Sequence, residues 1–250
     1  MPAKASQMGM KERSRLWSSI GKKILTGLTG IALMSFIIVH LLGNLTLLAG
    51  PDLFNAYAHA LESKGALILV AELGLLTLFL AHAASATWVF LDNRGARTVE
   101  NTIVQSKGGP SRQSISSRSM IFTGAVLLVF TIIHVVAFRF GPTVADGYVT
   151  TLHGQPVRDL NRLVVETFKR LPVVAFYTGV MILLGLHLRH GFWSAFQSLG
   201  ALGPRLRPIA YTAGIVFGAV IAVGFLLLPI WLHLFAPLPG PSNLAGIPHP

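Results

Sequence analysis

The stretch FIIVHLLGNLTLL, residues 36–48, places His40 inside an almost unbroken apolar run. A side chain that can carry a charge is costly where water is absent, so such residues are rare in membrane spans and usually functional. Similar apolar runs surround His82, His134 and His187. One histidine in each of four apolar segments favours a role that the four share.

The composition of the chain excludes an ordinary soluble protein. Its 250 residues are 52% hydrophobic and only 12% charged, with a mean hydropathy of +0.64. A soluble domain carries roughly twice that charged fraction. The chain has no cysteine, which excludes disulfides, thiolate iron–sulfur clusters and thioether-attached haem within it. We therefore expect one membrane-embedded domain.

The apolar segments are long enough to cross a membrane, because about 20 apolar residues span roughly 30 Å of hydrocarbon. We expect an all-α membrane protein with a cytoplasmic N-terminal segment (1–23), a five-helix domain (24–235) and an irregular tail rich in proline and glycine (236–250). No internal repeat stands out. The five expected helices cover residues 24–49, 66–91, 119–140, 172–196 and 209–235.

Lysine and arginine predict the orientation. The net charge is +11, and the basic residues lie at the edges of the apolar segments, where they set topology. With the N-terminus in the cytoplasm, fourteen of the twenty basic residues lie inside. The N-terminal stretch lacks the apolar run and small-residue cleavage site of a signal peptide, so we interpret it as mature cytoplasmic chain.

The four histidines lie at matched depths. Each is about 15–17 residues into its segment, which is roughly 22–25 Å along a crossing of ~30 Å. Because successive helices alternate in direction, His40 and His134 share one depth (the outer pair) and His82 and His187 another (the inner pair). The two depths differ by roughly 15 Å.

A pair of histidines on facing helices is what a six-coordinate haem b requires. We therefore expect the first four helices to form a bundle that holds two b haems stacked across the membrane. A single intramembrane histidine is often only a hydrogen-bonding residue between helices, and this remains the alternative for each. A membrane transporter would show polar or broken helix centres in paired halves, which the sequence lacks.

The chain resembles a known family over about residues 24–200. The similarity is to the di-haem cytochrome b membrane anchor of succinate dehydrogenase and fumarate reductase (complex II), of the single-polypeptide, five-helix type. The resemblance implies that His40 and His134 hold the distal haem and that His82 and His187 hold the proximal one. The matching stretches are FIIVHLLGN, LFNAYAHALES, VAELGLLTLFLAHA, IIHVVAFR and HLRHGFWSAFQSLG.

The resemblance also implies partners and a place in the cell. A flavoprotein and an iron–sulfur subunit would dock on the cytoplasmic side of a bacterial inner membrane, with the dicarboxylate chemistry on the partner chain. This chain would pass electrons to or from a membrane quinone, with menaquinone favoured over ubiquinone. The nearest alternative is a di-haem subunit of another respiratory enzyme, such as a hydrogenase or formate dehydrogenase.

A quinone needs a proton donor or acceptor near each carbonyl and an apolar slot for its tail. Each candidate has a plainer interpretation as an interfacial or topology residue. His190 lies one turn beyond His187 and is expected to contact a propionate or a quinone, or to lie at the interface. The candidates are His59, Glu62 and Arg139 on the outer side, and Ser18, Ser19, Lys23 and His190 on the inner side.

Glu72 is unusual because it lies within an expected span, where a carboxylate must be paired or protonated. We expect either a place in a proton path or a hydrogen bond to the helix of residues 24–49 or that of 172–196.

Overall fold

The computed structural model describes residues 18–95 and 119–238, and most of them are helical. Within these residues, five helices are long and apolar enough to cross a membrane, which confirms the predicted number of spans and their positions to within a few residues. Residues 1–17, 96–118 and 239–250 lie outside the described residues. The five helices are α1 (Ser19–Leu45), α3 (Ala66–Gly95), α5 (Met120–Phe138), α7 (Leu171–Ser198) and α8 (Leu206–Phe235).

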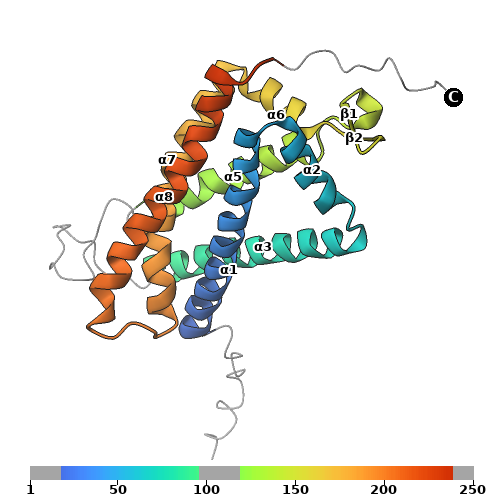
Figure 1. The fold of residues 1–250 in the computed structure, drawn as a ribbon. Coiled ribbons are helices and arrows are strands. Elements are labelled where there is room, and N and C mark those ends of the chain that lie inside the picture. The colour runs from blue at the N-terminus through green and yellow to red at the C-terminus, as the bar shows by residue number, and fades with distance from the viewer. Residues whose placement is uncertain (1–17, 96–118, 239–250) are drawn as a thin grey trace, which may run out of the picture.

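Helices α7 and α8 form the most closely packed pair, and α1 lies against α7 (Figure 1). Glycines permit the close approach: a Cβ at Gly218 would come within 2.6 Å of the Gly185 carbonyl oxygen. Small residues at a helix contact let two backbones meet, and dispersion contacts then replace contacts with lipid. Met34 of α1, Met181 of α7 and Ile221 of α8 fill the core that the three helices share.

Helices α3 and α5 run across α1, α7 and α8 rather than beside them (Figure 1). The contact between α1 and α3 includes Thr26 against Ser85, and Ser85 is the only buried residue of α3. At the other end, α2 (Pro51–Glu62) separates α1 from α3, and its 12 residues span about 18 Å. Of the four histidine-bearing helices, α3 and α5 therefore run obliquely to α1 and α7 (Figure 1).

A small cap covers the end of the molecule where α1 ends and α7 begins. It contains α2, a two-stranded antiparallel hairpin and a second amphipathic helix, α6. The hairpin turns at His153 and Gly154, which both have positive φ, as a two-residue turn requires. Besides α2, the elements of the cap are η2 (Thr46–Ala49), η3 (Val144–Asp146), β1 (Val149–Leu152), β2 (Gln155–Arg158) and α6 (Leu160–Phe168).

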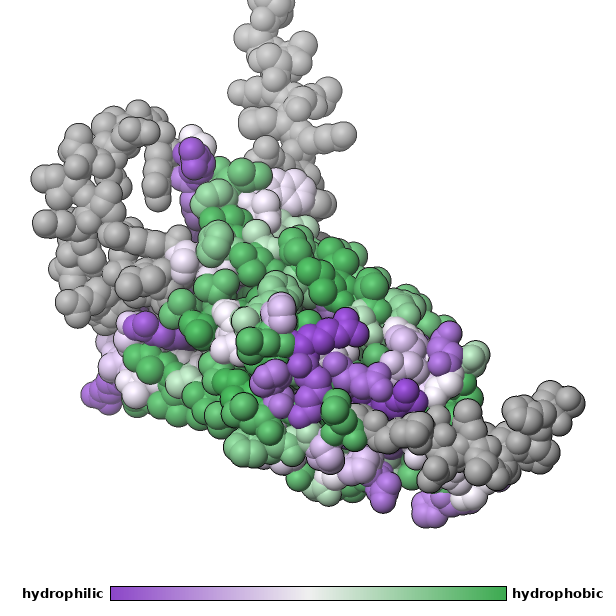
Figure 2. All heavy atoms as spheres, turned by 90° about the horizontal axis from the view of Figure 1, so that it is seen from above, coloured by the Kyte–Doolittle hydropathy of each residue, from purple (hydrophilic) through white to green (hydrophobic). Residues whose placement is uncertain are grey.

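Asn55 joins the two helices of the cap. Its side chain is 2% exposed; it donates to Asp159 Oδ1 at 2.9 Å and accepts from the backbone N–H of Asn161 at 2.9 Å. Asp159 in turn caps α6 by accepting from the backbone N–H of Arg162. Seen from above, this end carries a patch of hydrophilic side chains on an otherwise largely hydrophobic surface (Figure 2).

Candidate functional site

The outer pair joins α1 and α5. The ring centroids of His40 and His134 lie 5.7 Å apart, and the ring planes are nearly perpendicular at 89°. Each ring stacks on a phenylalanine one turn earlier in its own helix, Phe36 at 5.3 Å and Phe130 at 5.6 Å. These aromatic rings fix where the imidazoles lie without using their nitrogens.

The polar contacts of the outer pair are long. The Tyr177 hydroxyl lies 3.5 Å from His134 Nδ1, and the Asn44 side-chain nitrogen lies 3.4 Å from His40 Nε2. Both separations exceed the usual 2.7–3.2 Å of a hydrogen bond. The outer imidazoles are therefore held mainly by aromatic packing.

The inner pair joins α3 and α7. The ring centroids of His82 and His187 lie 6.4 Å apart at an interplanar angle of 73°. The structure thus brings together the same two pairs of side chains that the matched depths predict. Each inner ring has a closer polar partner on a neighbouring helix than either outer ring has, at 3.1–3.3 Å.

The groups that contact His82 lie on α1. His82 Nδ1 lies 3.2 Å from the Thr26 carbonyl oxygen and 3.3 Å from Thr29 Oγ1. A carbonyl oxygen only accepts hydrogen bonds, so Nδ1 carries the ring proton. The Thr29 hydroxyl donates to the Leu25 carbonyl oxygen at 2.7 Å, which leaves its oxygen to accept from the same Nδ1–H.

The residue that contacts His187 lies on α5. His187 Nδ1 lies 3.1 Å from Thr123 Oγ1. The Thr123 hydroxyl donates to the Ser119 carbonyl oxygen at 3.0 Å, which leaves its oxygen able to accept from an Nδ1–H of His187. With the ring proton on Nδ1, as the Thr26 carbonyl oxygen requires for His82, the lone pair of Nε2 is available as a ligand.

The spacing of the inner pair, and less closely that of the outer pair, suits two imidazoles that would share one metal ion. Two imidazoles that bind one iron from opposite sides, through bonds of about 2.0 Å, have ring centroids roughly 6.3 Å apart. The inner pair matches this separation at 6.4 Å, and the outer pair is slightly closer at 5.7 Å. No three histidine, aspartate or glutamate side chains gather in the described residues as a bare metal ion would require. Two histidines would be enough for an iron that already has four porphyrin nitrogens as ligands.

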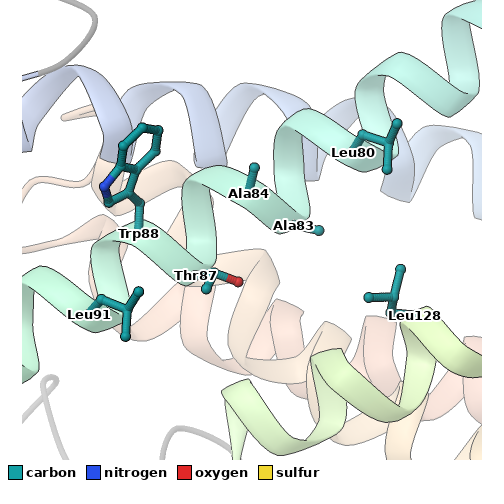
Figure 3. A pocket seen from close by; sticks show the side chains of 7 residues that line it. All are labelled: Leu80, Ala83, Ala84, Thr87, Trp88, Leu91 and Leu128. Carbon is teal, nitrogen blue, oxygen red and sulfur yellow. The ribbon is translucent and has the colours of Figure 1, made fainter.

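An apolar cavity of about 400 Å³ lies between α3 and α5 (Figure 3). Its walls are almost wholly apolar, and neither histidine of the inner pair lines it. The lining residues are Leu80, Ala83, Ala84, Thr87, Trp88, Leu91 and Leu128.

The residues that hold the inner pair form a repeat that the sequence analysis missed. Helix α1 carries TGIALMSFIIVH from Thr29 to His40, and α5 carries TGAVLLVFTIIH from Thr123 to His134. Both follow the order Thr-Gly, five residues, Phe, three residues, His. Eleven residues are three helical turns and about 20°, so each threonine shares a face with its outer histidine about 16 Å away.

The glycine of each repeat lies against an inner ring. A Cβ at Gly30 would lie 3.3 Å from His82 Cε1, and one at Gly124 would lie 3.6 Å from His187 Cε1. The first separation is tighter than most Cβ contacts, whereas the second is ordinary. The Thr-Gly step therefore supplies a hydrogen-bond acceptor and, at Gly30, space for the imidazole.

The outer quinone candidates lie near one another. Arg139 Nε donates to Glu72 Oε1 at 2.6 Å, and the Arg158 guanidinium lies 3.6 Å from Glu62. The hydrogen bond to Glu72 raises the pKa of Arg139, and the negative charges of Glu72 and Glu62 act in the same direction. Glu62 and Arg139 therefore belong to one charged cluster, and His59 is exposed on α2 one turn before Glu62.

Glu72 is paired, as a carboxylate within an expected span must be, but the expected hydrogen bond to α1 or α7 was wrong. Its side chain is 37% exposed, and its partner is Arg139 at the end of α5 rather than a residue of α1 or α7. The reason is the oblique course of α3, which directs this part of the helix toward α5 (Figure 1). Glu72 and Arg139 link two helices that otherwise have few contacts.

The inner quinone candidates have simpler positions. Ser18 caps α1 by accepting from the backbone N–H of Gly21 at 3.0 Å, and Ser19 and Lys23 are exposed. The buried cation of this region is Lys22, which the sequence analysis passed over. Its ammonium group lies 2.6 Å from Asp92 of α3 and 4.9 Å from the ring of Trp88.

Two further histidines are distinct from the four. His190 packs edge-on against Trp193, with centroids 5.4 Å apart. His233 Nδ1 donates to the Phe168 carbonyl oxygen at 3.0 Å and so joins α8 to α6. Both have neighbours that account for their positions.

Comparison with known proteins adds no relative: no protein-family model, curated protein or solved structure matches the chain.

Proposed function

We propose that this chain is a di-haem cytochrome b that anchors a succinate:quinone oxidoreductase in the membrane and carries its electrons. The observation that supports the haem assignment is the presence of two imidazole pairs on facing helices, with ring centroids 5.7 Å and 6.4 Å apart. Support for the complex II assignment comes from the sequence stretches around these histidines.

In this proposal His40 and His134 hold one haem, and His82 and His187 hold the other. Haem supplies one-electron redox chemistry when it is bound. The chain contributes ligands of fixed orientation: Phe36 and Phe130 stack on the outer rings, and polar groups of α1 and α5 contact the inner ones. The two pairs lie about 16 Å apart along the helices, so the two haems would form consecutive electron-transfer sites across the membrane.

The remaining parts of the proposal concern partners. A flavoprotein performs the dicarboxylate chemistry, and an iron–sulfur subunit delivers or receives electrons on the cytoplasmic side of a bacterial inner membrane. The absence of cysteine from this chain fits clusters that belong to that subunit. The quinone, menaquinone in preference to ubiquinone, reacts near Glu62 and Arg139 at the charged outer cluster.

The first experiment is haem content per polypeptide. We expect the pyridine haemochrome of the purified full-length chain to give two b haems, with a reduced-minus-oxidised spectrum of low-spin, six-coordinate iron. One haem would restrict the proposal to a single pair. No haem would contradict it and leave the four histidines as hydrogen-bonding residues between helices.

The chains that co-purify distinguish the family from its alternatives. A flavin-containing partner supports succinate:quinone oxidoreductase. A nickel-containing partner would assign the same di-haem subunit to a hydrogenase and contradict the complex II assignment.

A further inference from the structure

We propose that Thr29 and Thr123 are positioning residues that set the redox potential of the haem held by the inner pair. They would act through His82 and His187, by accepting the Nδ1–H of each ligand. This inference rests on the proposed function, because it concerns the iron that these histidines would bind.

The burial of the two hydroxyls requires a partner. Thr29 is 4% exposed and Thr123 is 1% exposed, although both lie in helices made mainly of apolar residues. A buried hydroxyl without hydrogen bonds is costly, and a backbone carbonyl accepts the single proton of each. The oxygen of each hydroxyl then has an acceptor position left, which the imidazole of the neighbouring helix uses.

Ordinary helix chemistry does not explain this arrangement. Thr77 and Thr131 also donate to the carbonyl four residues earlier, each at 2.8 Å, as threonines in apolar helices commonly do. No hydrogen bond joins either of them to a histidine in the described residues. Among the described residues, hydroxyl contact with an inner imidazole is therefore made by the two threonines that precede glycine in the repeat.

A hydrogen bond at Nδ1 changes what Nε2 offers to a metal. An acceptor that draws on the Nδ1 proton increases the electron density of the ring and makes Nε2 a stronger donor. A stronger donor stabilises the more highly charged, oxidised iron, so the reduction potential falls. The outer pair provides an internal reference, since the polar contact of His134 is 3.5 Å long and involves Tyr177 rather than a threonine.

The test compares Thr29→Val, Thr123→Val and the double variant with Thr29→Ser and Thr123→Ser in the full-length protein. Valine keeps the shape of threonine and removes the hydroxyl acceptor, which leaves the Thr26 carbonyl oxygen as the remaining partner of His82 Nδ1, whereas serine keeps the hydroxyl. Thr131→Val is the matched control, because it removes the same kind of back-bonded hydroxyl from the same helix, α5. The measurement is a redox titration of the haem absorption bands, in which each haem gives one titration step (its wave). The variants His82→Ala and His134→Ala show which wave belongs to the inner haem and which to the outer haem.

We expect each valine variant to shift the inner wave to higher potential and the double variant to shift it further. The outer wave, the serine variants and Thr131→Val should titrate as the unmodified protein does. Loss of the inner haem in the valine variants, with retention in the serine variants and the control, would also support a role for the hydroxyls.

An unchanged inner wave in the double variant, with both haems retained, overturns this inference and leaves the proposed function intact. An equal shift in Thr131→Val overturns it as well, because the effect would then be general to the helix. An unmodified protein without haem contradicts the proposed function itself, and the inference falls with it.

Discussion

At the scale of single residues, the two members of each imidazole pair depend on each other. A six-coordinate iron needs both ligands of its pair. Alanine at His82 or at His187 should therefore remove the same haem, and the two variants should leave identical residual spectra. The measurement is the reduced-minus-oxidised spectrum of each purified variant. Different residual spectra would show that the two side chains do not share an iron.

His190 provides the matched control on the same helix. It lies one turn from His187 and packs against Trp193. His190→Ala should keep both haems at the level of the unmodified protein. Loss of a full haem in this variant would transfer the ligand role from His187 to His190.

The sequence predicts which histidines meet but not what holds them. The four imidazoles stand out because ionisable groups are rare in apolar spans. Thr29 and Thr123 do not stand out, since threonine is common in such helices and usually bonds to its own backbone. The signal that identifies them is the parallel order of residues in 29–40 and 123–134, which becomes meaningful once both threonines are seen beside an inner ring.

At the scale of elements, Asn55 connects α2 to α6 and is the best place to test the cap. Asn55→Ala would remove one donor and one acceptor from a buried site and leave the Asn161 N–H without its partner. An unsatisfied buried group costs about 1–3 kcal/mol, so we expect a loss of stability of that size. Denaturant unfolding in detergent and hydrogen exchange of α2 and α6 are the measurements.

Ser63→Ala is the control for this prediction, because the exposed Ser63 hydroxyl donates to the Ala60 carbonyl at the end of the same helix. We expect it to change stability by less than about 0.5 kcal/mol. Equal effects of the two substitutions would show that Asn55 does not join the helices of the cap.

Hydrophobic length predicts the five spans well, because crossing a membrane requires a long apolar run. It does not predict the cap, whose strands have four residues each and whose helix α6 has nine. Nor does it predict the oblique course of α3 and α5, which depends on contacts such as Lys22 with Asp92 and Arg139 with Glu72. These pairs join residues about 70 positions apart, and no local pattern contains them.

At the scale of the whole molecule, the distribution of lysine and arginine predicts the orientation. Alkaline phosphatase, which is active only outside the cytoplasm, can be fused after Gly95 of α3 or after the end of α8. We expect low activity for the first fusion and high activity for the second, because α3 should end in the cytoplasm and α8 outside it. The opposite result would show that the protein has the reverse orientation in the membrane, with His40 and His134 nearer the cytoplasm.

The cavity between α3 and α5 opens at the side of the molecule, between two helices, and its walls are apolar (Figure 3). A molecule dissolved among acyl chains reaches such an opening by diffusing in two dimensions, without meeting water. An ion would first lose its hydration shell, which costs many kcal/mol. An apolar opening of this kind favours apolar molecules over ions before any side chain binds them.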